Sequence, residues 1–472
     1  MYDVKSMNAE EFISHQEIMD TLEWAEEKKN DKELCLEYIE KARKLKGLTH
    51  REAAVLLLNE DPEVTEKIFE AAGEIKEAFY GNRIVMVAPL YLSNYCVNGC
   101  VYCPYHKKNK NIVRHKLTQE ELKKEVIALQ DMGHKRLVLE AGEDPVNNPI
   151  EYILECIKTI YSIKHKNGAI RRVNINIAAT SVENYRKLKE AEIGTYTLFQ
   201  ETYNKEQYEK LHPSGPKSDY IYHTEAMDRA MQGGIDDVGL GVLFGLNLYK
   251  YDFVGLLMHA EHLEAAFGVG PHTISVPRLR DADDVDSSKF KNGISDDLFL
   301  KITALIRIVV PYTGIIISSR ESEETRAKLL PVGISQMSGG SRTTVGGYNA
   351  SRENAENSAQ FETSDTRELD EVVEWLLDVG HIPSFCTACY RAGRQGDRFM
   401  PLVKAGEIKN CCLPNALITL KEYLVDYAND RVREKGEKMI QEQIPNIKSD
   451  KVREEVLVHL KDIENGQRDF RF

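Results

Sequence analysis

Eight short runs rich in β-branched and other apolar residues recur through the middle of the chain, and they constrain the fold more than any other feature. The runs are 84–90, 136–140, 172–179, 195–200, 236–245, 272–276, 314–319 and 330–335. Amphipathic stretches with helical spacing lie between them, at 118–132, 148–165, 218–232, 251–267 and 294–310. This alternation predicts parallel strands with crossover helices, and eight repeats in about 250 residues favour a closed (β/α)8 barrel over a doubly wound sheet. Active sites in such barrels lie at the carboxyl ends of the strands.

The segments before and after this region predict two further units. The first 80 residues have helical spacing, and Thr49 and Glu52 form a capping box that begins a helix. A polar stretch at 349–368 predicts a linker or an extended wrap, and a helix is expected at 368–378. We therefore expect an N-terminal helical extension (1–80), the barrel (81–350) and a mainly helical C-terminal domain (351–472).

Charge and hydropathy exclude two classes of partner. The chain has 62 basic and 75 acidic residues, a formal net charge of −13, which repels nucleic acid and anionic membrane surfaces. No apolar run approaches the roughly 20 residues of a membrane-spanning helix, and the N-terminus lacks the pattern of a signal peptide. We expect a cytoplasmic protein with no nucleic-acid or membrane partner.

Three of the nine cysteines follow the first expected strand with the spacing Cys96-x3-Cys100-x2-Cys103. Clustered cysteines in a cytosolic chain indicate metal or redox chemistry rather than disulfides. A structural zinc site needs a fourth protein ligand, which this motif does not offer. A cubane iron–sulfur cluster held by three thiolates keeps one iron with an exchangeable position. Zinc, or a solely structural cluster, is the alternative interpretation.

This spacing resembles that of the radical S-adenosylmethionine (SAM) superfamily. The resemblance implies that Cys96, Cys100 and Cys103 bind a 4Fe–4S cluster and that SAM chelates its fourth iron. Electron transfer then breaks a sulfonium C–S bond and generates a deoxyadenosyl radical. Tyr102, the aromatic residue before the last cysteine, is expected to pack near the adenine.

Other positions match superfamily elements for binding SAM. Ala141-Gly142-Glu143 resembles the Gly-Gly-Glu motif that meets the methionyl ammonium, with Ala in place of the first Gly. Glu201 and Arg229 match the groups for the SAM ribose and carboxylate, and Gly241 matches a strand glycine that approaches the adenine. A surface ion pair is the alternative for the two charged residues, and relief of crowding is the alternative for the glycine.

Later segments resemble the aromatic amino-acid lyase branch of the superfamily. They are 272–278, 318–322 and 341–348. In this branch, a tyrosine lyase of the thiamine pathway and an iron–iron hydrogenase maturase both cleave tyrosine between Cα and Cβ. The resemblance implies that Arg320 and Ser318 clamp the carboxylate of the amino acid, a role that suits a guanidinium. A buried structural arginine is the alternative.

A second cysteine motif favours the hydrogenase maturases over the thiamine lyases. Cys386-x2-Cys389-x22-Cys412 resembles the motif for an auxiliary iron–sulfur cluster that thiamine-pathway enzymes lack. Cys411 adjoins Cys412 and is a competing ligand, but the spacing selects Cys412. Taken alone, this motif also fits a zinc site.

The resemblance implies a function in two stages. L-Tyrosine is cleaved to p-cresol and dehydroglycine, and the fragment becomes CO and cyanide on the auxiliary 4Fe–4S cluster, for assembly of the iron–iron hydrogenase cofactor. A labile fifth iron, bridged by free cysteine, is expected to bind His262, with His259 and His272 as competitors. Expected partners are a flavodoxin or ferredoxin and other hydrogenase maturases. The alternatives are a 2-iminoacetate synthase for thiamine synthesis and a noncatalytic iron–sulfur scaffold.

Overall fold

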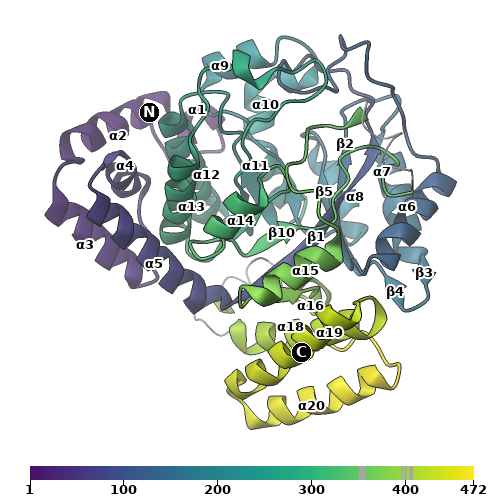
Figure 1. The fold of residues 1–472 in the computed structure, drawn as a ribbon. Helices are drawn as coiled ribbons and strands as arrows, with labels where there is room; N and C mark the ends of the chain where they lie inside the picture. Colours follow the sequence, from purple (N-terminus) through teal and green to yellow (C-terminus); the bar gives the residue numbers. More distant parts are fainter. Residues whose placement is uncertain (350–357, 395, 397, 399–400, 403–407) are drawn as a thin grey trace.

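Eight parallel strands form a closed barrel, with further helices added at both ends of the chain (Figure 1). The computed structural model describes residues 1–349, 358–394, 396, 398, 401, 402 and 408–472. The barrel strands, in spatial order, are β1 (Arg83–Ser93), β2 (Arg136–Ala141), β5 (Arg172–Asn176), β6 (Tyr196–Thr197), β7 (Val238–Gly241), β8 (Thr273–Ser275), β9 (Gly314–Ile317) and β10 (Gln336–Ser338). The predicted (β/α)8 fold is confirmed.

The barrel closes where β10 pairs with the middle of β1. Val85 is opposite Gln336 and Val87 is opposite Ser338 in this pairing. A further parallel strand, β11 (Ile382–Ser384), pairs with the first residues of β1, where Arg83 is opposite Ile382. The segment that follows β11 therefore lies at the amino ends of the barrel strands, the end opposite the one where barrel active sites form.

Both faces of the barrel strands are buried, which explains why β1 reads as an almost continuous apolar run. Successive side chains of a strand point to opposite faces. The outward side chains of β1 join the core beneath the helices; they are Ile84, Met86, Ala88, Leu90 and Leu92. Val87, Pro89 and Tyr91 instead line a cavity inside the barrel.

Helices surround the barrel between successive strands. They are α6 (Gln119–Asp131), α7 (Ile150–Ser162), α8 (Val182–Glu190), α9 (Lys205–Leu211), α10 (Tyr220–Thr224), α11 (Ala226–Gln232), α12 (Tyr249–Phe267), α13 (Asp296–Val309) and α14 (Glu323–Leu329). A capping box of Thr118 and Glu121 begins α6. A small antiparallel hairpin, β3 (Lys164–His165) with β4 (Gly168–Ala169), follows α7.

The N-terminal residues form helices that pack on one side of the barrel, at the left of Figure 1. They are α1 (Ala9–Phe12), α2 (His15–Lys28), α3 (Lys32–Arg43), α4 (His50–Leu58) and α5 (Pro62–Tyr80). The expected capping box of Thr49 and Glu52 begins α4. Contacts of α2, α4 and α5 with α12 and α13 attach this group to the barrel wall.

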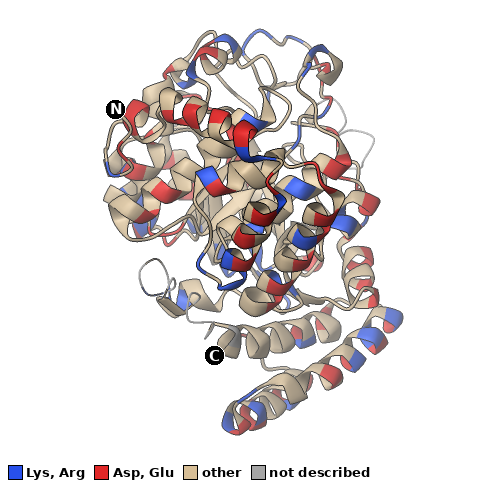
Figure 2. Ribbon diagram, turned by 90° about the vertical axis from the view of Figure 1, so that its left-hand side faces the viewer, with Lys and Arg blue, Asp and Glu red and all other residues tan. Residues whose placement is uncertain are grey.

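The C-terminal helices lie below the barrel in Figure 1. They are α15 (Leu369–Asp378), α16 (Ala388–Arg391), α18 (Lys409–Asp426), α19 (Asp430–Gln443) and α20 (Asp450–Glu464). Figure 2 shows basic and acidic residues interspersed along these last helices. No helix among the described residues is long and apolar enough to cross a membrane. Residues 350–357 of the expected linker lie outside the described part of the chain, and the domain boundaries stay a prediction.

The eighth strand was predicted in the wrong place. Residues 330–335 form the turn after α14, and the strand is the next segment, β10. The apolar run misleads because Leu330 and Ile334 are buried in the core without being strand residues. Strand β10 begins with polar Gln336, whose side chain lines the barrel interior.

Candidate functional site

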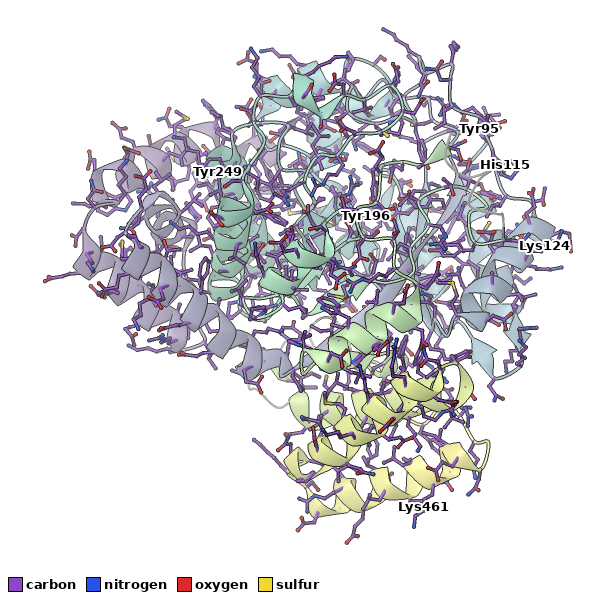
Figure 3. All side chains as sticks on the ribbon, viewed as in Figure 1. Tyr95, His115, Lys124, Tyr196, Tyr249 and Lys461 are labelled. Carbon is purple, nitrogen blue, oxygen red and sulfur yellow. The ribbon has the colours of Figure 1, made fainter. Side chains whose placement is uncertain are left out.

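A cavity of about 260 Å³ occupies the barrel interior and the loops at the carboxyl ends of the strands. Cys96, Cys100 and Cys103 all line it, on the loop that follows β1. In Figure 3, Tyr95 marks the start of this loop, on the far side of the barrel from Lys461 of α20. The structure thus brings the three thiols of the first motif together at the end of the barrel where active sites form.

These thiols suit a cluster rather than a single metal ion. In the described residues, no three His, Cys, Asp or Glu side chains are grouped closely enough to hold one ion. Burial raises the pKa of the Cys100 thiol to about 11 and raises that of Cys103 further, the latter also through the nearby thiolates. Thiols this reluctant to ionise on their own lose their protons when a metal centre binds them.

Gly142 and Glu143 lie directly against the cysteine loop. A Cβ atom on Gly142 would come within 2.3 Å of the Tyr95 carbonyl oxygen, so only glycine allows this close approach. The Glu143 carboxylate accepts a hydrogen bond of 2.7 Å from the Asn98 side chain, and burial raises its pKa. Both residues line the cavity, where they are available to a ligand beside the cysteines.

Glu201 lines the same cavity in a strained backbone conformation, with φ of +67°. It forms an ion pair of 2.8 Å with the buried Lys217, a residue that sequence reasoning missed. Burial opposes the charge of Lys217, but Glu201 and Cys100 together raise its pKa. Lys217 also lies 5.7 Å from the centre of the Tyr102 ring. The ion pair therefore fixes one side of that ring.

His212, which sequence reasoning also missed, binds the hydroxyl end of the Tyr102 side chain. Its Nδ1 lies 2.7 Å from the Tyr208 carbonyl oxygen, which accepts only, so Nδ1 donates and Nε2 accepts. The Tyr102 hydroxyl therefore donates to Nε2, at 2.8 Å. No sequence signal links positions 102 and 212, because the contact depends on the packing of the loop after α9.

Two expected SAM-binding residues do not reach this cavity. Arg229 donates through its guanidinium to the carbonyls of Thr180 and Tyr222 and stacks on the Tyr222 ring, outside the cavity. A Cβ atom on Gly241 would lie 2.5 Å from the Phe199 ring. That glycine therefore makes room for Phe199, which lines the cavity in its place.

The side chains of Arg320 and Ser318 line the cavity from the loop after β9. The guanidinium lies over the Phe361 ring at 3.5 Å, and the Ser318 hydroxyl accepts a hydrogen bond from the Arg320 backbone. Glu140, at the end of β2, faces the same space. Burial raises the pKa of Glu140 to about 8, against weaker opposing effects of Asn176 and Arg320. Sequence reasoning missed Glu140 because only strand register brings it here.

A second, smaller cavity of about 70 Å³ lies at the amino ends of the barrel strands. Cys386, Cys389 and Cys412 line it, whereas Cys411 does not. Arg83 of β1 and Arg136 of β2 also line it, and Arg136 donates a hydrogen bond of 2.6 Å to the Cys386 carbonyl. The second cysteine motif therefore comes together at the opposite end of the barrel from the first.

One thiol of this second group is prepared for ionisation. The hydrogen bond from Cys412 and the charge of Arg394 lower the pKa of Cys389 to about 6, although burial opposes this. The same hydrogen bond and burial raise the pKa of Cys412 well above its ordinary value. A thiolate at Cys389 is a ready metal ligand near neutral pH.

The structure does not bring His262 to the second cavity. Its ring stacks on Phe12, Nδ1 lies 2.8 Å from the Val4 carbonyl oxygen, and Nε2 lies 3.1 Å from Asp228. These contacts occupy both nitrogens and attach α12 to the N-terminal segment. His272, one of the two competitors, lines the cavity instead. Its position directly before β8, at the amino end of a barrel strand, is the sequence signal that could have identified it as a residue of this cavity.

Comparison with known proteins agrees with this arrangement. Residues 90–257 match the model of the radical SAM superfamily, and residues 275–382 match the biotin and thiamin synthesis associated domain. With the barrel and the three thiols at its carboxyl end, the matches define a radical SAM enzyme, which binds a 4Fe–4S cluster and SAM.

Solved structures and curated relatives show which family of radical SAM enzymes the chain resembles. A crystal structure titled as HydG, a maturase of the FeFe-hydrogenase, is 55% identical, with a TM-score of 0.94 over 98% of this chain and 100% of that one. The HydG structure from Carboxydothermus hydrogenoformans is 39% identical, with a TM-score of 0.83 over 96% and 99%. The 2-iminoacetate synthase of Salmonella typhimurium is 27% identical over 73% of this chain and 89% of its own. The chain belongs to the HydG family.

Proposed function

We propose that this enzyme cleaves L-tyrosine to p-cresol and dehydroglycine in the first cavity and converts the fragment to CO and cyanide in the second. The observation that carries the proposal is the pair of thiol-lined cavities at opposite ends of one barrel. Gln336 lines both of them, so a small fragment has a short internal path. The product would serve in assembly of the iron–iron hydrogenase cofactor, in line with the similarity to HydG, a maturase of the FeFe-hydrogenase.

Cys96, Cys100 and Cys103 would hold the first cluster, with Glu143, Gly142 and Glu201 around SAM. When bound, cluster and SAM supply a deoxyadenosyl radical that removes hydrogen from the tyrosine amino group. Tyr102, positioned by His212 and by the Lys217–Glu201 ion pair, closes one wall of the site. This enclosure excludes water from a reactive radical.

Arg320 and Ser318 would orient the tyrosine carboxylate. The guanidinium stacks on Phe361 but makes no side-chain hydrogen bond to another described residue, so its donors are available to a carboxylate. Held at this end, the amino acid places its Cα–Cβ bond within the enclosed barrel. The Arg278 and Arg280 guanidiniums do not compete for this role, because both pair with Glu321.

Cys386, Cys389 and Cys412 would hold an auxiliary 4Fe–4S cluster, and His272 would be available to bind a labile additional iron together with free cysteine. Burial lowers the pKa of His272, which keeps the imidazole neutral and able to bind a metal. His272 replaces His262 in this proposal. Further proposed partners are a flavodoxin or ferredoxin and other hydrogenase maturases, in the cytoplasm, where thiols stay reduced.

The test is the double variant Cys386→Ala with Cys389→Ala in the anaerobically reconstituted enzyme. We expect p-cresol to form from tyrosine while CO formation is lost, because only the second site is removed. Cys411→Ala is the matched control, since this neighbouring thiol lies outside the cavity, and it should keep both products. Wild-type enzyme that forms p-cresol but no CO would favour 2-iminoacetate synthase activity, the activity named for the Salmonella relative. Wild-type enzyme that forms no deoxyadenosine would favour a scaffold.

A further inference from the structure

Two partly buried ionisable groups, one acidic and one basic, face the first cavity without an ion-pair partner among the described residues. Among the described residues, the Arg320 guanidinium has no ion pair and no hydrogen-bond acceptor, and it lies over the Phe361 ring. The Glu140 carboxyl likewise forms no ion pair with any described residue. Each influences the ionisation of the other, but they are not in direct contact.

The other charged groups that line the cavity have protein partners. Lys217 pairs with Glu201 at 2.8 Å, and Arg280 pairs with Glu321 at 2.6 Å. Glu143 accepts a hydrogen bond of 2.7 Å from Asn98. The Glu140 carboxyl accepts a hydrogen bond from the Asn176 side chain but has no cationic partner. Within the described part of the chain, neither Arg320 nor Glu140 forms an ion pair, and both face the open cavity.

Strand register fixes where Glu140 lies. It is opposite Tyr91 of β1 and opposite Asn176 of β5, and all three side chains line the cavity as one row. The Tyr91 hydroxyl donates a hydrogen bond of 2.8 Å to Gln360, which helps to close the space around this row. Glu140 therefore faces the barrel interior from a rigid strand end and not from a loop.

Ionising a side chain that is shielded from water costs free energy unless a partner supplies the opposite charge, so an acidic and a basic group that face one cavity point to a ligand that carries both charges. An α-amino acid is a zwitterion and brings both charges, one carbon apart. We propose that Glu140 binds the ammonium group of the amino-acid substrate while Arg320 binds its carboxylate. The identity of that amino acid rests on the proposed function; the ammonium site does not depend on the second cavity.

The experiment is anaerobic calorimetry on the reconstituted holoenzyme with SAM present. Three ligands are compared: L-tyrosine, 3-(4-hydroxyphenyl)propionate, which lacks the amine, and tyramine, which lacks the carboxylate. Glu140→Gln keeps the shape of the side chain but removes its charge. We expect this variant to bind L-tyrosine and tyramine about tenfold or more weakly, the range for a charge-assisted hydrogen bond, and the propionate with unchanged affinity.

Other results would overturn the assignment. An equal loss for all three ligands would mean that Glu140 contacts the phenol ring or hydroxyl. Loss of SAM affinity with tyrosine binding intact would assign the carboxyl to SAM. Unchanged tyrosine affinity would remove any ligand role. Glu140→Asp should recover part of the affinity for the two amines, which a purely structural role would not predict.

Two controls separate this proposal from others. Glu151→Gln, on the helix that follows the same strand, removes an exposed carboxylate and should change none of the three affinities. Failure of the wild-type enzyme to bind or cleave tyrosine would contradict the proposed function. Normal cleavage by the wild type, together with unchanged ligand preference in Glu140→Gln, would contradict the ammonium site alone.

Discussion

At the scale of single residues, we expect the charge of Glu140 to depend on what occupies the first cavity. Burial raises its pKa to about 8, and Asn176 and Arg320 only partly oppose this. Tyr91 and Tyr105, which lie near it, have pKa values well above that of an ordinary tyrosine, mainly through burial, so both are neutral near pH 7. The carboxyl of the free protein is therefore mostly protonated at neutral pH.

Tyrosine binding should accordingly release a proton. A substrate ammonium stabilises the carboxylate and lowers the pKa of Glu140, so the group is protonated before binding and ionised after it. We expect release of close to one proton at pH 7, falling as the pH rises past about 8, where the free protein has already lost it. Calorimetry in two buffers of different ionisation enthalpy measures this number.

Glu140→Gln provides the control for the proton count and should release none. If proton release is the same in the variant and the wild type, another group titrates on binding. A proton taken up at pH 7 would contradict the sign of the expected change, because it requires a group whose pKa rises when tyrosine binds.

Some residues of the two sites could be predicted from the sequence, and others could not. The cysteines of both motifs were found because their spacing is local and few other roles suit it. Glu140, Lys217 and His212 were missed because each meets its neighbours only through strand register or loop packing. The expectation for His262 came from the resemblance, and the structure places this residue on helix α12, away from the second cavity, which His272 lines instead.

At the scale of elements, seven of the eight barrel strands were predicted in place, because buried strands read as short apolar runs. The run predicted at 136–140 matches β2 to within one residue, and the run predicted at 272–276 exceeds β8 by one residue at each end. Strand β11 was missed, since it is three residues long and contains Pro383. Its position depends on pairing with the first residues of β1, a contact about 300 residues away in sequence that no local pattern records.

Helix α18 carries Cys412 and is held to the barrel by a buried ion pair. Arg171, just before β5, donates to Glu422 of α18 at 2.6 Å, and the exposed fractions of the two side chains are 8% and 1%. Arg171 also pairs with Asp469 near the C-terminus, at 3.1 Å. This network fixes the helix that supplies one wall of the second cavity.

Arg171→Met should therefore lower the free energy of unfolding by about 3 kcal/mol, because it leaves Glu422 as a buried charge without its partner. Denaturant titration measures the loss, and hydrogen exchange should increase in α18 but not in α12. Lys210→Met is the control: it removes an exposed pair with Glu206, and the expected loss is below about 0.5 kcal/mol. Equal losses in both variants would show that the Arg171 pair does not hold α18.

At the scale of the whole molecule, the two cavities lie at opposite ends of one barrel, and Gln336 of β10 lines both. The barrel interior between them carries small or polar side chains, among them Asn174, Thr197 and Ser275. Glycines widen it: a Cβ atom on Gly314 would lie 2.7 Å from the Gln336 amide nitrogen. We propose that a small polar fragment formed at one end reaches the other through this interior, past Gln336.

Gln336→Phe tests whether the fragment takes this route. The ring would fill space between the cavities, so the yield of CO per p-cresol should fall several-fold while the rate of p-cresol formation changes little. Gas analysis with labelled tyrosine gives both quantities in one reaction. Gln336→Met, which has a similar length and no ring, should keep the wild-type ratio. An unchanged ratio in Gln336→Phe would mean that the fragment reaches the second cluster through solvent, and added dehydroglycine should then restore CO to enzyme lacking tyrosine.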